Sequence, residues 1–306
     1  MRFGECGVPM MPTCSRHPLR EPRGTLWVDE GVAKLMMENL VEIHRHSAAS
    51  AVVILAPHGG RVIPAEHRDA FLISPEALEV EQDLMIDHHT DLLARALVER
   101  TGASAVINTL SRFVVDVERF PDEREEMNQV GMGVLYTHGS QRQPIRNMER
   151  THQGALLEFF HDYSAAITNL VGEVLDRHDH ALILDLHSFP LSPLPYELHH
   201  DERRPQLCLG HEEPHVPSVF MQQLRHELAD WDITDNEPFH GSYVPLQFLG
   251  SNPRVTSVML EIRRDTYLTE PAGEPLPGRL EVLEDAIVRA LDRLLSVSPI
   301  HDTQGD

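Results

Sequence analysis

Short runs of Val, Ile and Leu recur along the chain, and longer amphipathic segments separate most of them. Such runs are typical of strands that are buried on both faces of a sheet, and the amphipathic segments have the period of helices that cover it. The alternation therefore predicts an α/β fold with a mainly parallel or mixed central sheet flanked by helices. We expect strands over residues 51–57, 104–108, 112–117, 180–188 and 256–262, and helices over 31–45, 76–100, 152–177, 217–229 and 277–296.

Length and composition indicate one domain with loosely held ends. The 306 residues, with 41% hydrophobic content, suffice for one large core. We expect a single α/β domain over residues 25–296. The segments 1–24 and 297–306 are rich in Pro or charged residues, which predicts a loosely ordered start and a flexible C-terminal tail.

The formal charge of -22 argues against negatively charged partners. Such a chain repels phosphate backbones and anionic lipid surfaces, so we expect neither nucleic acid nor a membrane as a partner. No window approaches the ~20 apolar residues of a membrane span, and the first residues lack the apolar core of a signal peptide. Three cysteines without C-x-x-C spacing predict neither a disulfide framework nor a thiolate zinc site. We therefore expect a cytoplasmic protein.

Four polar residues stand at or just beyond the ends of expected strands, namely His58, Arg119, His187 and Glu261. In open α/β sheets, ligands bind in the crevice beyond the carboxyl ends of the strands. Two imidazoles and a carboxylate with one open position form the catalytic arrangement of zinc rather than the structural one. The two glycines after His58 would let the backbone turn sharply and leave room beside a metal. These features favour a metal hydrolase.

Five short motifs carry a resemblance to a known family. They are PHGG at 57–60, DLMIDHHTDLL at 83–93, SRFVVDVER at 111–119, DLHSFP at 185–190 and LEIRRDTYL at 260–268. In these motifs and their order the chain resembles the N-formylglutamate amidohydrolase family. The resemblance implies a zinc carboxypeptidase-like three-layer sandwich with one zinc ion per chain. It also implies an enzyme that hydrolyses the amide of an N-acyl amino acid with a metal-activated water.

The resemblance implies that His58 and His187 bind the zinc ion. Related enzymes have a carboxylate a few residues after the first histidine, but no acid stands that close to His58 here. Asp87 lies in the segment that resembles the acidic motif of the family, and we favour it as the third ligand. Glu66 and His89 are the alternatives.

The segment RFVVDVERFP resembles the substrate-holding segment of the family. Because a guanidinium is suited to bidentate recognition of a carboxylate, Arg119 is expected to grip the α-carboxylate of an amino acid. Arg112 is expected to stabilise the oxyanion on the scissile carbonyl, and Asp116 to orient an arginine. Glu118 departs from the family pattern, which has Asn beside the arginine. Its charge would disfavour an anionic substrate such as a glutamate derivative.

Glu261 ends an apolar strand, where an unpaired carboxylate is costly unless it has a partner or a chemical role. The resemblance implies that it is the general base, which takes a proton from water and passes it to the leaving amine. The structural alternative is an ion pair with Arg263 or Arg264.

The expected substrate is a small N-acyl amino acid of the N-formylglutamate type. The alternatives are a zinc exopeptidase or another amidase on the same scaffold, or a catalytically silent protein that holds a carboxylate through Arg119. The chain contains no G-x-S-x-G elbow, P-loop or G-x-G-x-x-G, so serine hydrolase and nucleotide-binding functions lack support.

Overall fold

The computed structural model describes residues 39–45, 50–198, 203–216, 218–270 and 273–296, so the segments expected to be loose, 1–24 and 297–306, lie outside it. Seven strands in this part of the chain form one sheet in the order β1-β3-β2-β4-β7-β5-β6. β1 and β5 run antiparallel to β3 and β7, and the other adjacent strands are parallel. The strands are β1 (Val41–His44), β2 (Val52–Ala56), β3 (Ser104–Asn108), β4 (Ala181–Phe189), β5 (Leu207–Gly210), β6 (Ile233–Asp235) and β7 (Val255–Arg263). The expected mixed sheet is confirmed.

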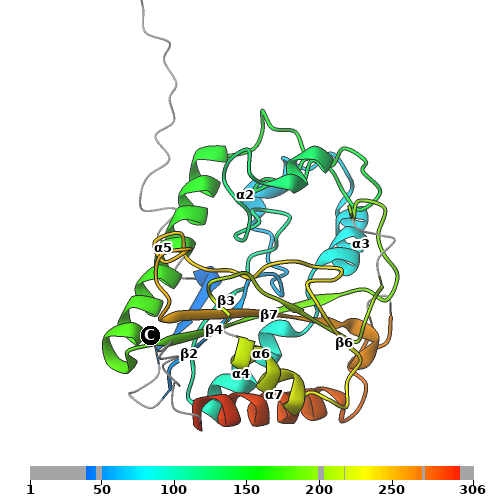
Figure 1. The fold of residues 1–306 in the computed structure, drawn as a ribbon. Coiled ribbons are helices and arrows are strands. Elements are labelled where there is room, and N and C mark those ends of the chain that lie inside the picture. Colours follow the sequence, from blue (N-terminus) through cyan, green and yellow to red (C-terminus); the bar gives the residue numbers. More distant parts are fainter. Residues whose placement is uncertain (1–38, 46–49, 199–202, 217, 271–272, 297–306) are drawn as a thin grey trace, which may run out of the picture.

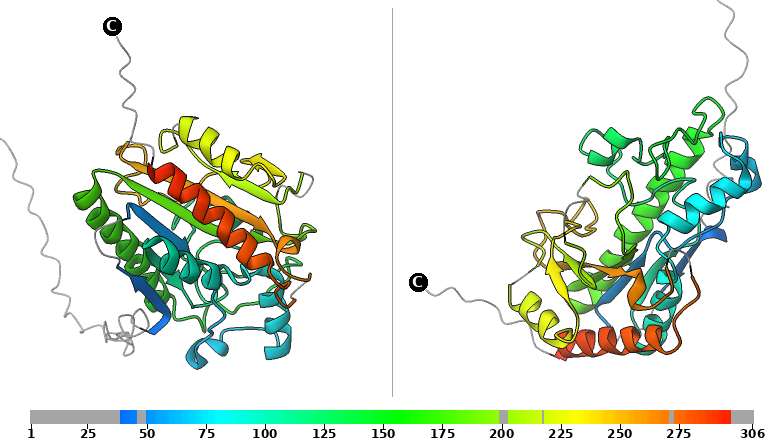
Figure 2. Two further views of the ribbon diagram at one scale, coloured as in Figure 1. Left: turned by 90° about the horizontal axis from the view of Figure 1, so that it is seen from below. Right: turned by 90° about the vertical axis from the view of Figure 1, so that its right-hand side faces the viewer.

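Helices cover both faces of this sheet and complete a three-layer α/β sandwich (Figure 1). On one face α7 (Arg279–Ser296) packs between α4 (Thr90–Thr101) and α6 (Ser218–Glu227), as Figure 2 shows. The long helix α5 (Gln153–His178) crosses the other face. Shorter helices occur in the connections, namely α2 (Ala65–Arg68), α3 (Pro75–Met85), η1 (Glu126–Val130) and η2 (Arg264–Thr266).

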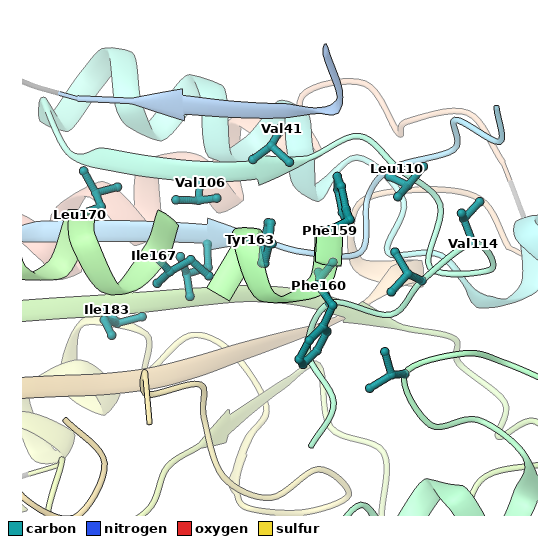
Figure 3. Packing of buried hydrophobic residues seen from close by; sticks show 14 of the residues in the cluster. Val41, Val106, Leu110, Val114, Phe159, Phe160, Tyr163, Ile167, Leu170 and Ile183 are labelled. Atoms are coloured by element: carbon teal, nitrogen blue, oxygen red, sulfur yellow. The ribbon is translucent and has the colours of Figure 1, made fainter. Parts of the chain in front are cut away.

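The alternation of side chains along β2 divides them between two hydrophobic cores. Val53 and Leu55 belong to the core beneath α5, where Tyr163 packs toward the sheet (Figure 3). Ile54 belongs to the core on the opposite face, together with Leu97 of α4. Because both faces are covered, all five residues of β2 are buried, which explains its continuous apolar sequence.

The prediction of a strand over 112–117 is wrong, because this segment forms turns. Its apolar side chains are buried, but its backbone groups find partners outside the sheet. The Asp116 N–H donates to the carbonyl of Val134, and the guanidinium of Arg146 donates to the carbonyls of Phe113 and Val114. With these bonds made, the segment can be buried without strand pairing.

The prediction of a helix over 31–45 is wrong for residues 41–44, which form strand β1 and pair with β3. Residues before 39 lie outside the described part of the chain. The helix expected over 76–100 is two helices, α3 and α4. The chain leaves α3 at Ile86 in an extended conformation and enters α4 through His89, whose φ is 61°. The break is important for the site, because Asp87 lies in it.

The strands β2, β4 and β7 are adjacent and parallel, so their carboxyl ends meet at one edge of the sheet. This edge is where open α/β sheets bind ligands. Among the described helices, none combines the length and the apolar character that crossing a membrane requires.

Candidate active site

His58 lies in the loop that follows β2, and buried hydrogen bonds fix the backbone of this loop. The side chain of Asn108, at the end of β3, donates to the carbonyl of Pro57 at 2.9 Å. The N–H of Asp87 donates to the carbonyl of His58 at 3.0 Å. The break between α3 and α4 is therefore tied directly to the loop after β2, which brings Asp87 beside His58.

Gly60 lets this loop approach a neighbouring segment closely. A Cβ atom at this position would lie 2.3 Å from the carbonyl carbon of Thr109, which is less than any real contact allows. The sequence suggests that the glycines leave room beside a metal, whereas the structure shows that Gly60 is needed for packing against backbone.

Three side-chain atoms from separate segments converge at the edge of the sheet. The Nδ1 atoms of His58 and His187 are 3.3 Å apart, and Asp87 Oδ2 lies 3.7 Å from the first and 3.0 Å from the second. Tetrahedral zinc with bonds of about 2.0–2.1 Å requires ligand atoms roughly 3.4 Å apart. The triangle therefore has the dimensions of a site for one zinc ion, and its donor set is the two imidazoles and one carboxylate typical of catalytic zinc.

A buried carboxylate lies behind each of these imidazoles. Asp116 Oδ1 accepts a hydrogen bond from His58 Nε2 at 2.8 Å, and Asp185 Oδ1 accepts one from His187 Nε2 at 3.0 Å. Carboxylates in this position fix the orientation of an imidazole ligand and raise its basicity. Sequence reasoning gave Asp116 only the role of orienting an arginine and missed Asp185. The signal for Asp185 is its spacing, since residues two apart on a strand share a face.

Glu118 is a second carboxylate near the same imidazoles, and its position groups it with His58 and His187 as a potential ligand. Its Oε2 lies 2.9 Å from His187 Nε2 and 3.9 Å from His58 Nδ1. It therefore approaches His187 from the nitrogen that Asp185 already occupies, whereas Asp87 faces the two Nδ1 atoms together. Of the two carboxylates, Asp87 is therefore the one that faces both Nδ1 atoms.

The two other sequence candidates lie elsewhere. Glu66 is exposed on α2. His89 lines a hollow with Arg61, Asp91 and Glu274, and none of the three atoms of the triangle belongs to a residue that borders it.

The charges of the buried carboxylates and imidazoles in this cluster stabilise one another. Burial would raise the pKa of Asp87, but hydrogen bonds from His187 and His58 outweigh burial and hold that pKa well below its usual range. Burial would lower the pKa of His187, but the charges of Asp185 and Glu118 raise it well above its usual range. The acids thus favour a positive charge at this point, which a divalent cation would also supply.

Arg112 and Arg119 lie on the side of the site formed by the turn segment 111–119. Arg112 donates to Asp116 Oδ2 at 2.8 Å and to the Tyr136 hydroxyl at 2.9 Å, and its Nη1 is 3.7 Å from Asp87 Oδ1. Arg119 Nε lies 3.4 Å from Asp116 but has no hydrogen-bond partner, and the side chain is 21% exposed. Arg112 is thus engaged in holding carboxylates, and Arg119 is the more available of the two for a ligand.

Glu261 is the register partner of His187 on the neighbouring strand, so the two side chains share a face of the sheet. It is buried, and its Oε2 makes no hydrogen bond. Burial raises its pKa to about 8. Neither arginine of the structural alternative pairs with it, because Arg263 binds Asp265 and Arg264 donates to backbone carbonyls. A buried carboxyl without a hydrogen-bond partner near this cluster of imidazoles and carboxylates is a candidate acid or base.

Comparisons with known proteins show the family of the chain and agree with its fold. The model of the N-formylglutamate amidohydrolase family matches residues 50–268. The solved N-formylglutamate amidohydrolase from Ralstonia eutropha JMP134 is similar in fold, with a TM-score of 0.66 and 22% identity over 83% of this chain and 96% of that one. The gene product Atu2144 from Agrobacterium tumefaciens gives a TM-score of 0.63 and 16% identity over 84% and 95%. None of the curated proteins matches the chain.

Proposed function

The chain belongs to the N-formylglutamate amidohydrolase family, and on this premise we propose that it is a zinc-dependent enzyme that hydrolyses the amide bond of an N-acyl amino acid. The observation that carries the proposal is the triangle of His58 Nδ1, His187 Nδ1 and Asp87 Oδ2, with Glu261 beside it.

In this proposal His58, Asp87 and His187 hold the zinc ion, and Asp116 and Asp185 keep both imidazoles in the tautomer that offers Nδ1. When bound, zinc supplies Lewis acidity, which polarises an acyl carbonyl and lowers the pKa of water.

Glu261 is the proton carrier of the reaction. Its Oε2 is free of hydrogen bonds and can accept a proton from the attacking water, then deliver it to the nitrogen of the leaving amino acid. A carboxyl whose pKa lies near neutrality can serve in both directions, and proximity to a divalent cation favours the ionised form needed for the first step.

Arg119 binds the α-carboxylate of the substrate, because its side chain is more exposed to solvent than that of Arg112. Arg112 positions the carboxylates of the site, because it donates a hydrogen bond to Asp116 and lies close to Asp87. Its Nη1 group, which makes only a 3.3 Å bond to the carbonyl of Met85, is the donor that could also meet the developing oxyanion.

The test is the release of free amino acid from N-formyl, N-acetyl and N-succinyl derivatives, followed in chelated protein and after zinc is restored. We expect turnover of at least one N-acyl amino acid that is lost on chelation and regained with zinc. His187→Ala should abolish zinc binding and turnover, and His180→Ala, an exposed histidine just before the same strand, is the matched control.

Three results would contradict the proposed function. Turnover of peptides but not of N-acyl amino acids indicates an exopeptidase. Binding of N-acyl amino acids without release of product indicates a catalytically silent protein. Turnover that chelation leaves intact contradicts the role of the metal.

A further inference from the structure

Two oppositely charged neighbours, Glu118 and Arg119, form the solvent-accessible edge of the site. Their side chains are 16% and 21% exposed, whereas those of Asp87, Asp116 and Asp185 are at most 5% exposed. A substrate that approaches the zinc-binding triangle from solvent therefore meets a guanidinium and a carboxylate side by side.

Glu118 is fixed close to the metal-binding atoms. Its Oε2 contacts His187 Nε2 at 2.9 Å and lies 3.9 Å from His58 Nδ1. Its backbone N–H donates to Asp116 Oδ1 at 3.1 Å, so the same carboxylate that orients His58 also fixes the backbone of Glu118. No arginine among the described residues forms an ion pair with Glu118, because the arginines of this segment are turned to Asp116.

Of the two arginines beside the proposed metal site, Arg119 is the more exposed, at 21% against 9% for Arg112. Its Nε lies 3.4 Å from Asp116 Oδ2, and its Nη2 donates to the Tyr136 hydroxyl at 3.5 Å. Arg112 is bound to Asp116 and Tyr136, and Arg264 is 1% exposed and bound to backbone carbonyls of Leu84 and Ile86. Among the described residues, Arg119 can thus neutralise one carboxylate of a substrate. A second carboxylate on the same substrate would meet the negative charge of Glu118.

We propose that Glu118 sets the substrate class, so that the site accepts N-acyl amino acids with an uncharged or cationic side chain and rejects those with an acidic one such as glutamate. The inference rests on the proposed function, since it concerns the substrate of that same site. Like charges a few ångströms apart repel even in the partly aqueous mouth of a site, while an uncharged isostere of the same shape meets no such repulsion.

The experiment compares N-formylglutamine with N-formylglutamate, which have nearly the same shape and differ by one charge. Dissociation constants are measured by calorimetry with zinc-loaded Glu261→Gln protein, and again after Glu118→Gln or Glu123→Gln is added. Glu123 is exposed a few residues further along the chain and serves as the matched control. We expect the glutamine derivative to bind at least about tenfold more tightly. Glu118→Gln should reduce that preference about tenfold, and Glu123→Gln should leave it unchanged.

Equal affinities, tighter binding of the glutamate derivative, or a preference that Glu118→Gln does not change would overturn the inference. Loss of zinc from the Glu118→Gln protein would also overturn it, because Glu118 would then be a ligand. Turnover by the parent protein is measured in parallel. Binding with the expected preference but without turnover contradicts the proposed function alone, and binding of neither compound contradicts both.

Discussion

Replacing Glu261 by Gln separates proton transfer from metal binding. The amide keeps the shape of the side chain but cannot accept a proton from water. The three atoms proposed to hold the zinc ion belong to other residues, so the variant should still bind zinc. The proposal therefore predicts a folded, zinc-loaded protein with little activity.

The size of both effects follows from the environment of Glu261. Loss of a positioned general base typically lowers kcat by roughly 10²–10⁴-fold. Whereas kcat falls, the variant should lose less stability than the parent as pH rises, because burial raises the pKa of the Glu261 carboxyl from 4.5 to about 8. The folded metal-free protein then holds a proton that the unfolded chain releases, so the free energy of unfolding falls as pH rises from about 4.5 to about 8. At about 1.4 kcal/mol per pKa unit, this group lowers the free energy of unfolding by a few kcal/mol in total over that pH range.

Three measurements check this prediction. The kcat of the zinc-loaded variant is compared with that of the parent and of Glu281→Gln, an exposed control on α7. Zinc content is measured on the same samples. Urea unfolding of the metal-free proteins at pH 5 and pH 8 should show a smaller loss of stability in Glu261→Gln than in the parent. A variant that keeps most of the parent kcat would refute the role of Glu261 as the base.

Further predictions concern the ligands and the loop that carries the first histidine. Asp87→Asn should weaken zinc binding far more than Glu118→Gln in a chelator competition, and the reverse order would make Glu118 the third ligand. Asp116→Asn removes a charged acceptor behind one ligand imidazole and should weaken zinc binding about 10–100-fold; an unchanged affinity in the folded variant would argue against this support. Gly60→Ala forces a Cβ against backbone and should lower the free energy of unfolding by about 1–3 kcal/mol or more. Gly154→Ala, which has open space, is its control, and equal stability of the two variants would contradict the packing argument.

Much of the fold could be predicted from the sequence because the central strands are buried on both faces. β2 is a continuous apolar run, β3, β4 and β7 are mostly apolar, and the helices that cover the sheet have a clear amphipathic period. The strands β1, β5 and β6 have only four, four and three residues, so their sequences carry little pattern. Their conformation depends on pairing with neighbours, which a local reading of the sequence does not contain.

The site was partly predictable for the same reason. His58, His187 and Glu261 follow or end strands that the sequence identifies, and parallel strands place such residues at one edge. The turn segment was harder, because an apolar run that is buried without pairing resembles a strand. Reading it as a strand hid the fact that Asp116 turns back to His58, 58 residues earlier in the chain. The same turn brings Glu118 beside the imidazoles.

The central claim is that one zinc ion is held by His58, Asp87 and His187. The most direct measurement is a crystal structure of the zinc-loaded protein with anomalous data at the zinc edge. We expect a single strong anomalous peak within about 2.0–2.2 Å of His58 Nδ1, His187 Nδ1 and a carboxylate oxygen of Asp87. A peak bound by Glu118 in place of Asp87, a peak elsewhere in the molecule, or no peak at full zinc loading would contradict the account.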